Sequence, residues 1–141
     1  MKVTMLLADA AQAVNGKLYI LGGGWSITGP DPSPSAIALK IEVPWTDTNR
    51  KHRLELRLLD ADGQPVRVPT QAGEHPVEFG GEFEVGRPPG HPEGSPLDMV
   101  LAINMGPLQL QPDRRYEWKC FINENTKEDW RVGFYTRPTE K

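Results

Sequence analysis

The most informative segment for the fold is Leu108-Gln-Leu-Gln-Pro-Asp-Arg-Arg-Tyr-Glu-Trp-Lys-Cys-Phe-Ile122. Leu108 and Leu110 alternate with glutamines, and Tyr116, Trp118, Cys120 and Ile122 then recur at every second position. A period of two is typical of a strand with one buried and one exposed face. Pro112 lacks the N–H donor that a sheet needs, and Asp113 favours turns. The stretch therefore predicts a strand over 108–111, a turn, and a second strand over 116–122.

A Pro-Asp turn followed by a tyrosine that opens the next strand resembles the tyrosine corner of immunoglobulin-like sandwiches. In that motif the phenol hydroxyl bonds to the backbone a few residues upstream and holds the crossover between two sheets. An ordinary tight hairpin with a buried Tyr116 is the alternative. Either arrangement makes this region all-β.

The rest of the chain shows similar alternation in short segments that are separated by turn residues. Besides the two strands above, we expect strands at 3–8, 17–27, 37–43, 54–58, 66–68, 77–85, 99–103 and 130–134. Half-polar alternation indicates antiparallel sheets with one solvated face, and packing two such sheets together buries the apolar faces. The sequence thus predicts an all-β fold, an antiparallel two-sheet sandwich of the immunoglobulin-like kind. A chain of 141 residues fits one domain, which we place at 1–136, with a C-terminal tail at 137–141.

Several connections carry specific expectations. The segment 9–14 is expected to be a connector, with one helical turn as an option, and Asn15-Gly16 is a strong hairpin signal. The three glycines at 22–24 predict a bulge or a close approach by another backbone. The first strand, 3–8, is apolar enough to be buried on both faces. The segment 86–96 holds four prolines and is expected to be an exposed loop.

Charge and cysteine content limit the possible partners and compartment. The net charge is −3 with both signs mixed, so no broad basic face is expected, and neither nucleic acid nor an anionic membrane is a predicted partner. The single cysteine, Cys120, cannot form an internal disulfide and falls on the core face of its strand. The apolar run near the N-terminus is too short for a signal peptide, and no segment has the length of a membrane span. We expect a cytoplasmic protein.

No motif for catalysis or metal binding stands out. The glycines at 22–24 lack the following helix and Lys-Ser/Thr of a phosphate-binding loop. Asp60-Ala-Asp-Gly63 fits a hairpin turn better than a calcium loop, because no glutamate closes it. The histidines at 52, 75 and 91 show no ligand spacing, and no Gly-x-Ser-x-Gly elbow occurs. We expect no catalytic residue, no metal and no cofactor, although an enzyme assembled from distant loops stays open.

The candidate interaction residues are aromatic and polar side chains beside loops. An aromatic residue at a strand end either covers the edge of the core or anchors a partner. Arg87 and His91 are the expected polar contacts of the proline-rich loop. The candidates are Trp25, Trp45, Arg87, His91, Trp130 and Tyr135. The leading hypothesis is a non-enzymatic module that acts through protein–protein contacts, as a homo-oligomer or a subunit of a larger assembly. The alternative is a small-ligand or carbohydrate-binding module that uses the aromatic residues for stacking.

Four segments also carry a family resemblance: Met1-Lys-Val-Thr-Met-Leu-Leu-Ala-Asp-Ala-Ala11, Gly16-Lys-Leu-Tyr-Ile-Leu-Gly-Gly-Gly-Trp25, Val43-Pro-Trp45 and Leu58-Leu-Asp-Ala-Asp-Gly63. They resemble an uncharacterised family of small bacterial, largely actinobacterial, proteins of unknown function. The resemblance implies a β protein of the bacterial cytosol, with a phage-associated assembly as an option. It implies no activity, cofactor or catalytic residue.

Overall fold

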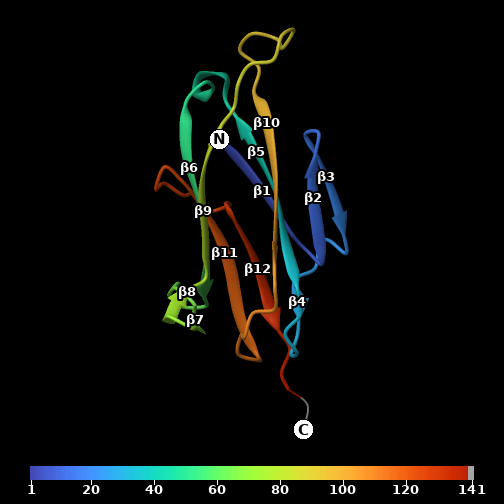
Figure 1. Cartoon of the computed structure of the whole chain (residues 1–141), viewed down its shortest axis with the longest axis vertical. Coiled ribbons are helices and arrows are strands. Elements are labelled where there is room, and N and C mark those ends of the chain that lie inside the picture. The colour runs from blue at the N-terminus through green and yellow to red at the C-terminus, as the bar shows by residue number, and fades with distance from the viewer. Residues whose placement is uncertain (140–141) are drawn as a thin grey trace.

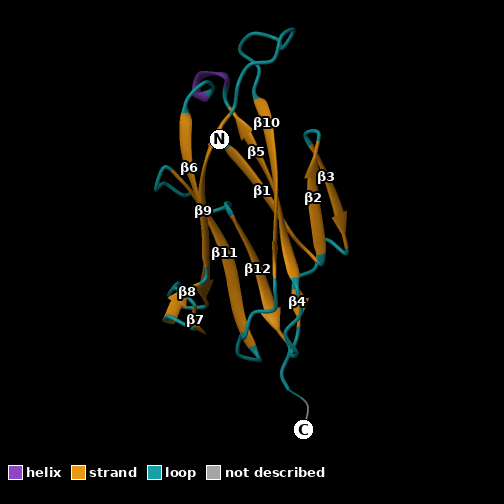
Figure 2. Cartoon of the chain, viewed as in Figure 1, coloured by secondary structure: helices purple, strands orange, loops and turns teal. Residues whose placement is uncertain are grey.

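The computed structural model describes residues 1–139, and strands dominate this part of the chain (Figures 1 and 2). Within it a single 3-10 turn, η1 (Trp45–Asp47), is the helical element. The strands are β1 (Lys2–Ala8), β2 (Ala10–Val14), β3 (Lys17–Leu21), β4 (Ile27–Thr28), β5 (Ser35–Val43), β6 (Lys51–Asp60), β7 (Arg67–Thr70), β8 (Gly73–Pro76), β9 (Glu78–Glu84), β10 (Leu97–Met105), β11 (Arg114–Ile122) and β12 (Arg131–Thr136).

Two sheets pack against each other, which confirms the predicted all-β sandwich. One sheet has the order β1-β5-β10, and the other has the order β4-β12-β11-β6-β9. All pairings within them are antiparallel except the short β4–β12 pair, which is parallel. The hairpins β2–β3 and β7–β8 form two further small sheets.

The apolar residues recur at every second position of the strands, and this alternation determines which side chains form the core. Alternate residues of β5 (Ile37, Leu39 and Ile41) point inward and meet Leu56 and Trp118 of the facing sheet, and all five are 2% exposed or less. Burial of each such side chain contributes about 1.5–3 kcal/mol, so the alternation itself drives the two sheets together. Cys120 is fully buried in the same layer, as its position in the pattern predicts.

The turn before β11 differs in part from the prediction. Residues 108–111 form no strand, although Leu108 and Leu110 still pack against the core. The N–H of Leu110 bonds to the carbonyl of Leu108 at 3.0 Å, so the segment turns on itself instead of joining a ladder. Asp113 takes a left-handed φ of 55°, and its N–H bonds to the carbonyl of Thr136 at the end of β12. The N–H of Gln111 donates to Tyr116 Oη at 3.1 Å. This is the upstream bond to the backbone that a tyrosine corner requires.

The prediction for 9–14 was wrong, because β2 lies there and not a connector or helical turn. β2 pairs with β3 through a tight turn in which Asn15 and Gly16 both have positive φ, as the Asn-Gly signal indicates. The hairpin packs on the outer face of the first sheet through small side chains. These are Ala8, Ala11, Ala36 and Ala38, with Leu18 and Ala102 beside them. Pairing and close packing thus outweigh the helix propensity of Ala-Ala-Gln-Ala.

Two further expectations about strands also need correction. β1 is not buried on both faces, because Leu6 is 43% exposed and the burial of the strand alternates. The second strand does not continue through the glycines but ends at Leu21. The expected close approach is present, since the N–H of Gly24 bonds to the carbonyl of Leu7 at 2.7 Å and a side chain at Gly22 would clash with Asp9.

The predicted tail begins in an ordered state. The N–H of Arg137 donates to the carbonyl of Thr28 at 2.9 Å, and its guanidinium donates to the carbonyl of Gly29. Residues 140–141 of the tail lie outside the described residues.

Candidate functional site

The structure brings together Trp45, Arg87 and His91 of the predicted interaction residues. The guanidinium of Arg87 lies 3.8 Å from the centre of the Trp45 ring, and the His91 ring stacks on the same indole at 6.0 Å and 9°. Arg87 also donates to Thr48 Oγ1 at 2.7 Å and to the carbonyl of Trp45 at 2.9 Å. These contacts fix the loop 85–96 on η1, at the top of Figure 1. The polar groups of Arg87 therefore serve the fold of the loop first.

The other three predicted residues lie apart from this cluster. Trp130 is buried and packs in the core. Trp25 meets Phe134 edge-on at 6.1 Å, and its Nε1 is buried without a partner among the described residues. Tyr135 donates its hydroxyl to the Asp113 carboxylate, and this bond raises the pKa of Tyr135. The aromatic residues therefore do not form one stacking platform.

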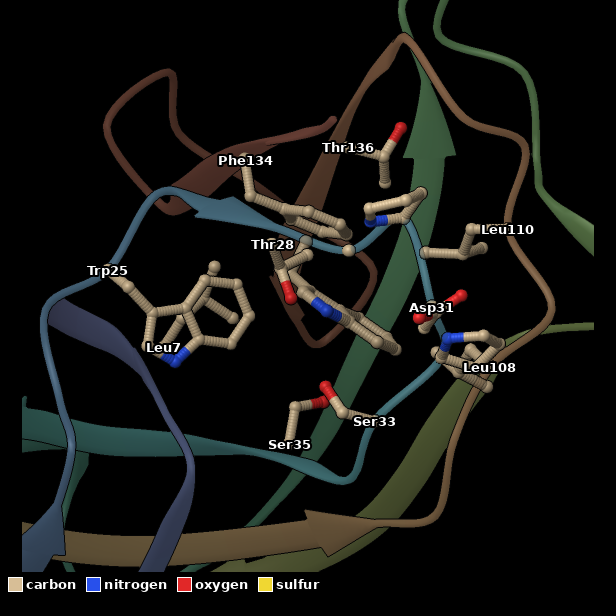
Figure 3. Close-up of a pocket in the computed structure, with 14 residues that line it drawn as sticks. Leu7, Trp25, Thr28, Asp31, Ser33, Ser35, Leu108, Leu110, Phe134 and Thr136 are labelled. Carbon is tan, nitrogen blue, oxygen red and sulfur yellow. The ribbon is translucent and has the colours of Figure 1, made fainter. Parts of the chain in front are cut away.

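A small cavity lies between the sheets near the loop 29–34 (Figure 3). Figure 3 shows Trp25, Leu7 and Phe134 on one side, and Asp31, Leu108 and Leu110 on the other. Its volume is about 50 Å³. One water needs roughly 10–15 Å³ of such space, so the cavity holds a few waters and no sugar or drug-sized ligand.

A larger apolar groove opens between β9 and β10, and we call it the edge groove. Its volume is about 340 Å³. The apolar side chains that line it are Leu54, Leu56, Phe79, Phe83, Met99, Leu101 and Ile103. Leu54 and Leu56 are buried, but Phe79 and Phe83 of β9 and the three residues of β10 remain partly exposed. The groove is thus a part of the hydrophobic core that the two sheets leave open.

Strand edges flank the edge groove on both sides. β9 ends the five-stranded sheet and has β6 as its one neighbour among the described strands. β10 ends the three-stranded sheet in the same way, next to β5. An edge strand leaves half of its backbone N–H and C=O groups outside the ladder, so it is a ready template for another strand. The loop 85–96 joins the two edge strands.

Sequence reasoning missed the edge groove, although it identified the strands on both sides. The alternation at 77–85 and 99–103 shows that one face of each segment is apolar, but it does not show which strands end a sheet. The one local feature of the sequence that could have indicated the groove is the pair Gly80-Gly81. A side chain at Gly81 would meet nothing within 4 Å, so this glycine leaves a notch in the groove.

The described part of the chain offers little for catalysis. No group of three His, Cys, Asp or Glu side chains within residues 1–139 could hold a metal ion. Burial raises the pKa of the Cys120 thiol to about 12, which keeps it protonated and unreactive at neutral pH. His52 is buried and bonded to the carbonyl of Asp47 and to Asn123, so it serves the fold. No helix in this part of the chain is long and apolar enough to span a bilayer.

A family model for a family of unknown function, DUF6941, matches residues 3–133. The chain belongs to this family. No curated protein and no solved structure matches the chain.

Membership of DUF6941 confirms the resemblance to an uncharacterised family. The match spans every strand that lines the edge groove, from β6 to β10. Because the description of DUF6941 assigns no activity, any role for this chain has to be argued from the geometry of its surface.

Proposed function

We propose that this DUF6941 protein is a non-catalytic binding module that acts through protein–protein contacts, and that the edge groove is its binding surface. One observation carries the proposal: two unpaired strand edges flank an apolar groove that is continuous with the core. In β-augmentation, an extended segment adds to an exposed edge, and its alternate side chains enter apolar pockets.

The groove supplies both parts of such an interaction. The free backbone groups of β9 and β10 offer hydrogen bonds to an extended segment. The half-buried side chains of Phe79, Phe83 and Leu101 offer apolar contacts that water now covers in part. Burial of apolar area is the main favourable term in association, at about 25 cal/mol per Å².

The loop 85–96 joins β9 to β10 and adds a second contact surface to this proposal. Stacking of Arg87 and His91 on Trp45 holds the loop on η1. The loop folds into two turns, closed by hydrogen bonds from His91 N–H to the carbonyl of Pro88 and from Ser95 N–H to the carbonyl of Pro92. Its prolines limit the backbone freedom, so contacts to a partner would lose less entropy than contacts of a glycine-rich loop. Trp45 is half-buried, and its exposed part lines a depression separate from the edge groove.

We place this interaction in the cytoplasm. The protein's only cysteine is fully buried and reduced, which is compatible with a reducing compartment.

A groove-filling substitution tests the proposal. Gly81→Val places a β-branched side chain in the notch, where the added Cβ would meet no atom within 4 Å, so the fold should persist. The matched control is Gly133→Val on β12, where an added Cβ would also make only an ordinary contact. Both tagged variants and the original protein are used to capture proteins from a lysate of the native host. We expect a partner with the original protein and with Gly133→Val, and none with Gly81→Val. Equal capture by all three would contradict the proposal.

A further inference from the structure

We infer that the occupant of the edge groove is an extended segment from another protein in which apolar and basic side chains alternate, paired to β9 as a sixth strand of the larger sheet. This inference rests on the proposed function and adds the chemistry of the partner. It is argued from the two faces of β9.

The inward face of β9 is apolar, so a strand that pairs with β9 should present apolar side chains on the same side. Phe79, Gly81 and Phe83 lie opposite Leu56, Leu54 and His52 of β6, so they share the groove side of the sheet. The His52 ring packs at a tilt against Phe83, with 5.2 Å between ring centres, and Phe79 packs against Trp118 at 5.6 Å. The notch at Gly81 lies between the two phenylalanines and has room for a side chain from a neighbouring strand. A strand that pairs with β9 therefore needs apolar residues at every second position.

The outward face of β9 is acidic. Glu78, Glu82 and Glu84 alternate with the groove residues and are exposed. On their β6 side the three glutamates lie opposite Lys51, Arg53 and Arg57. Within residues 1–139, none of the three comes within ion-pair distance of these groups, and Arg53 and Arg57 bind Glu55 instead. A strand on the free edge of β9 would place its outward side chains next to these carboxylates. Opposite charges across two strands stabilise the pairing, so lysine or arginine fits these positions.

The same charges argue against a second copy of this chain in the groove. Antiparallel pairing of two β9 strands about Gly81 would set Glu78 opposite Glu84 of the other copy. Pairing about Gly80 would set Glu78 opposite Glu82. Like charges directly opposite each other destabilise a strand pair. A basic partner is therefore favoured over self-association at this edge.

Synthetic peptides test whether the edge groove binds an extended segment and whether it prefers basic over acidic side chains. Two capped peptides of about eight residues, within the usual strand length of about 3–10 residues, alternate valine with lysine or valine with glutamate. A third peptide has the composition of the first but places all lysines before all valines. Binding is followed by peptide anisotropy at low salt, where screening is weakest. We expect the alternating Lys-Val peptide to bind about tenfold more tightly than the Glu-Val peptide, because each exposed charge pair contributes little. The block peptide should bind weakly.

Two variants test whether the glutamates of β9 cause the charge preference and whether the notch at Gly81 is needed for peptide binding. Combined Glu78→Gln, Glu82→Gln and Glu84→Gln should remove the preference for Lys-Val over Glu-Val while binding persists. Gly81→Val should abolish binding of both peptides, and Gly133→Val should leave it unchanged. Equal binding of the Lys-Val and Glu-Val peptides to the original protein would overturn the charge assignment and leave the proposed function standing. If neither alternating peptide binds, or if Gly81→Val binds as well as the original protein, both the inference and the proposed function are wrong.

Discussion

At the scale of single residues, buried side chains with specific partners fasten the segment that follows β10 to the five-stranded sheet. Tyr116 is the clearest case, because its ring stacks on Phe134 at 5.6 Å while its hydroxyl accepts the N–H of Gln111. Thr136 supports the same corner by donating to the carbonyl of Gln111 at 2.7 Å. Two strands and the irregular segment 106–113 therefore meet through two hydroxyl groups.

Tyr116→Phe tests the corner. The substitution keeps the ring but leaves the N–H of Gln111 without its acceptor, which should lower the free energy of unfolding by about 1–3 kcal/mol. The measurement is urea denaturation followed by tryptophan fluorescence. An unchanged midpoint would show that the hydroxyl bond does not stabilise the corner.

Cys120 gives a second prediction at this scale. Its pKa is raised to about 12 in the folded protein, so the folded state keeps a proton that the unfolded state loses near the ordinary thiol value. Stability should therefore be full below the unfolded pKa and fall as the pH rises toward the folded pKa. Cys120→Ala should lack this part of the pH dependence when urea midpoints are compared across that alkaline range. A thiol reagent should also label the native protein slowly at neutral pH, and fast stoichiometric labelling would contradict the burial.

At the scale of elements, one amide side chain adds two hydrogen bonds to the alanine packing that holds the hairpin β2–β3 on the sandwich. Asn104 of β10 accepts the N–H of Ala11 at 3.1 Å and donates to the carbonyl of Ala11 at 2.7 Å. The Asn104 side chain thus makes the two hydrogen bonds to Ala11 that the backbone of a neighbouring strand would otherwise make. The outer face of the hairpin stays open, with Tyr19 and Leu21 exposed.

Asn104→Ala should release the hairpin without unfolding the sandwich. Both bonds to Ala11 are lost, so the amides of β2 and β3 should exchange faster with solvent while those of β5 and β11 do not change. Asn104→Asp is the matched variant, since it keeps the acceptor for the N–H but places a charge against the carbonyl. Hydrogen exchange measured by NMR distinguishes the cases. Equal exchange in all three proteins would mean that the alanine packing alone holds the hairpin.

At the scale of the whole molecule, the sequence predicted the fold class well but did not predict the edge groove. Alternation from Tyr116 to Ile122 and from Ile37 to Val43 marked the inward faces, because burial in a sandwich has the same period as the strand. The segment 9–14 was misjudged because alanines favour helices locally, and only the sheet beneath them makes small side chains useful. The edge groove depends on strand order, which is set by contacts far apart in the sequence. Trp45, Arg87 and His91 were identified individually, but their stacking was not.

We propose that the edge groove binds an extended segment, and amide hydrogen exchange across β9 is the decisive test of that pairing. The measurement compares the free protein with the protein saturated by the alternating Lys-Val peptide. Pairing with a new strand would protect the free N–H groups of residues 78–84, so we expect exchange to slow there, with smaller effects on β10. Unchanged exchange in β9, or slowing confined to the hairpin β2–β3 or to η1, would contradict the claim.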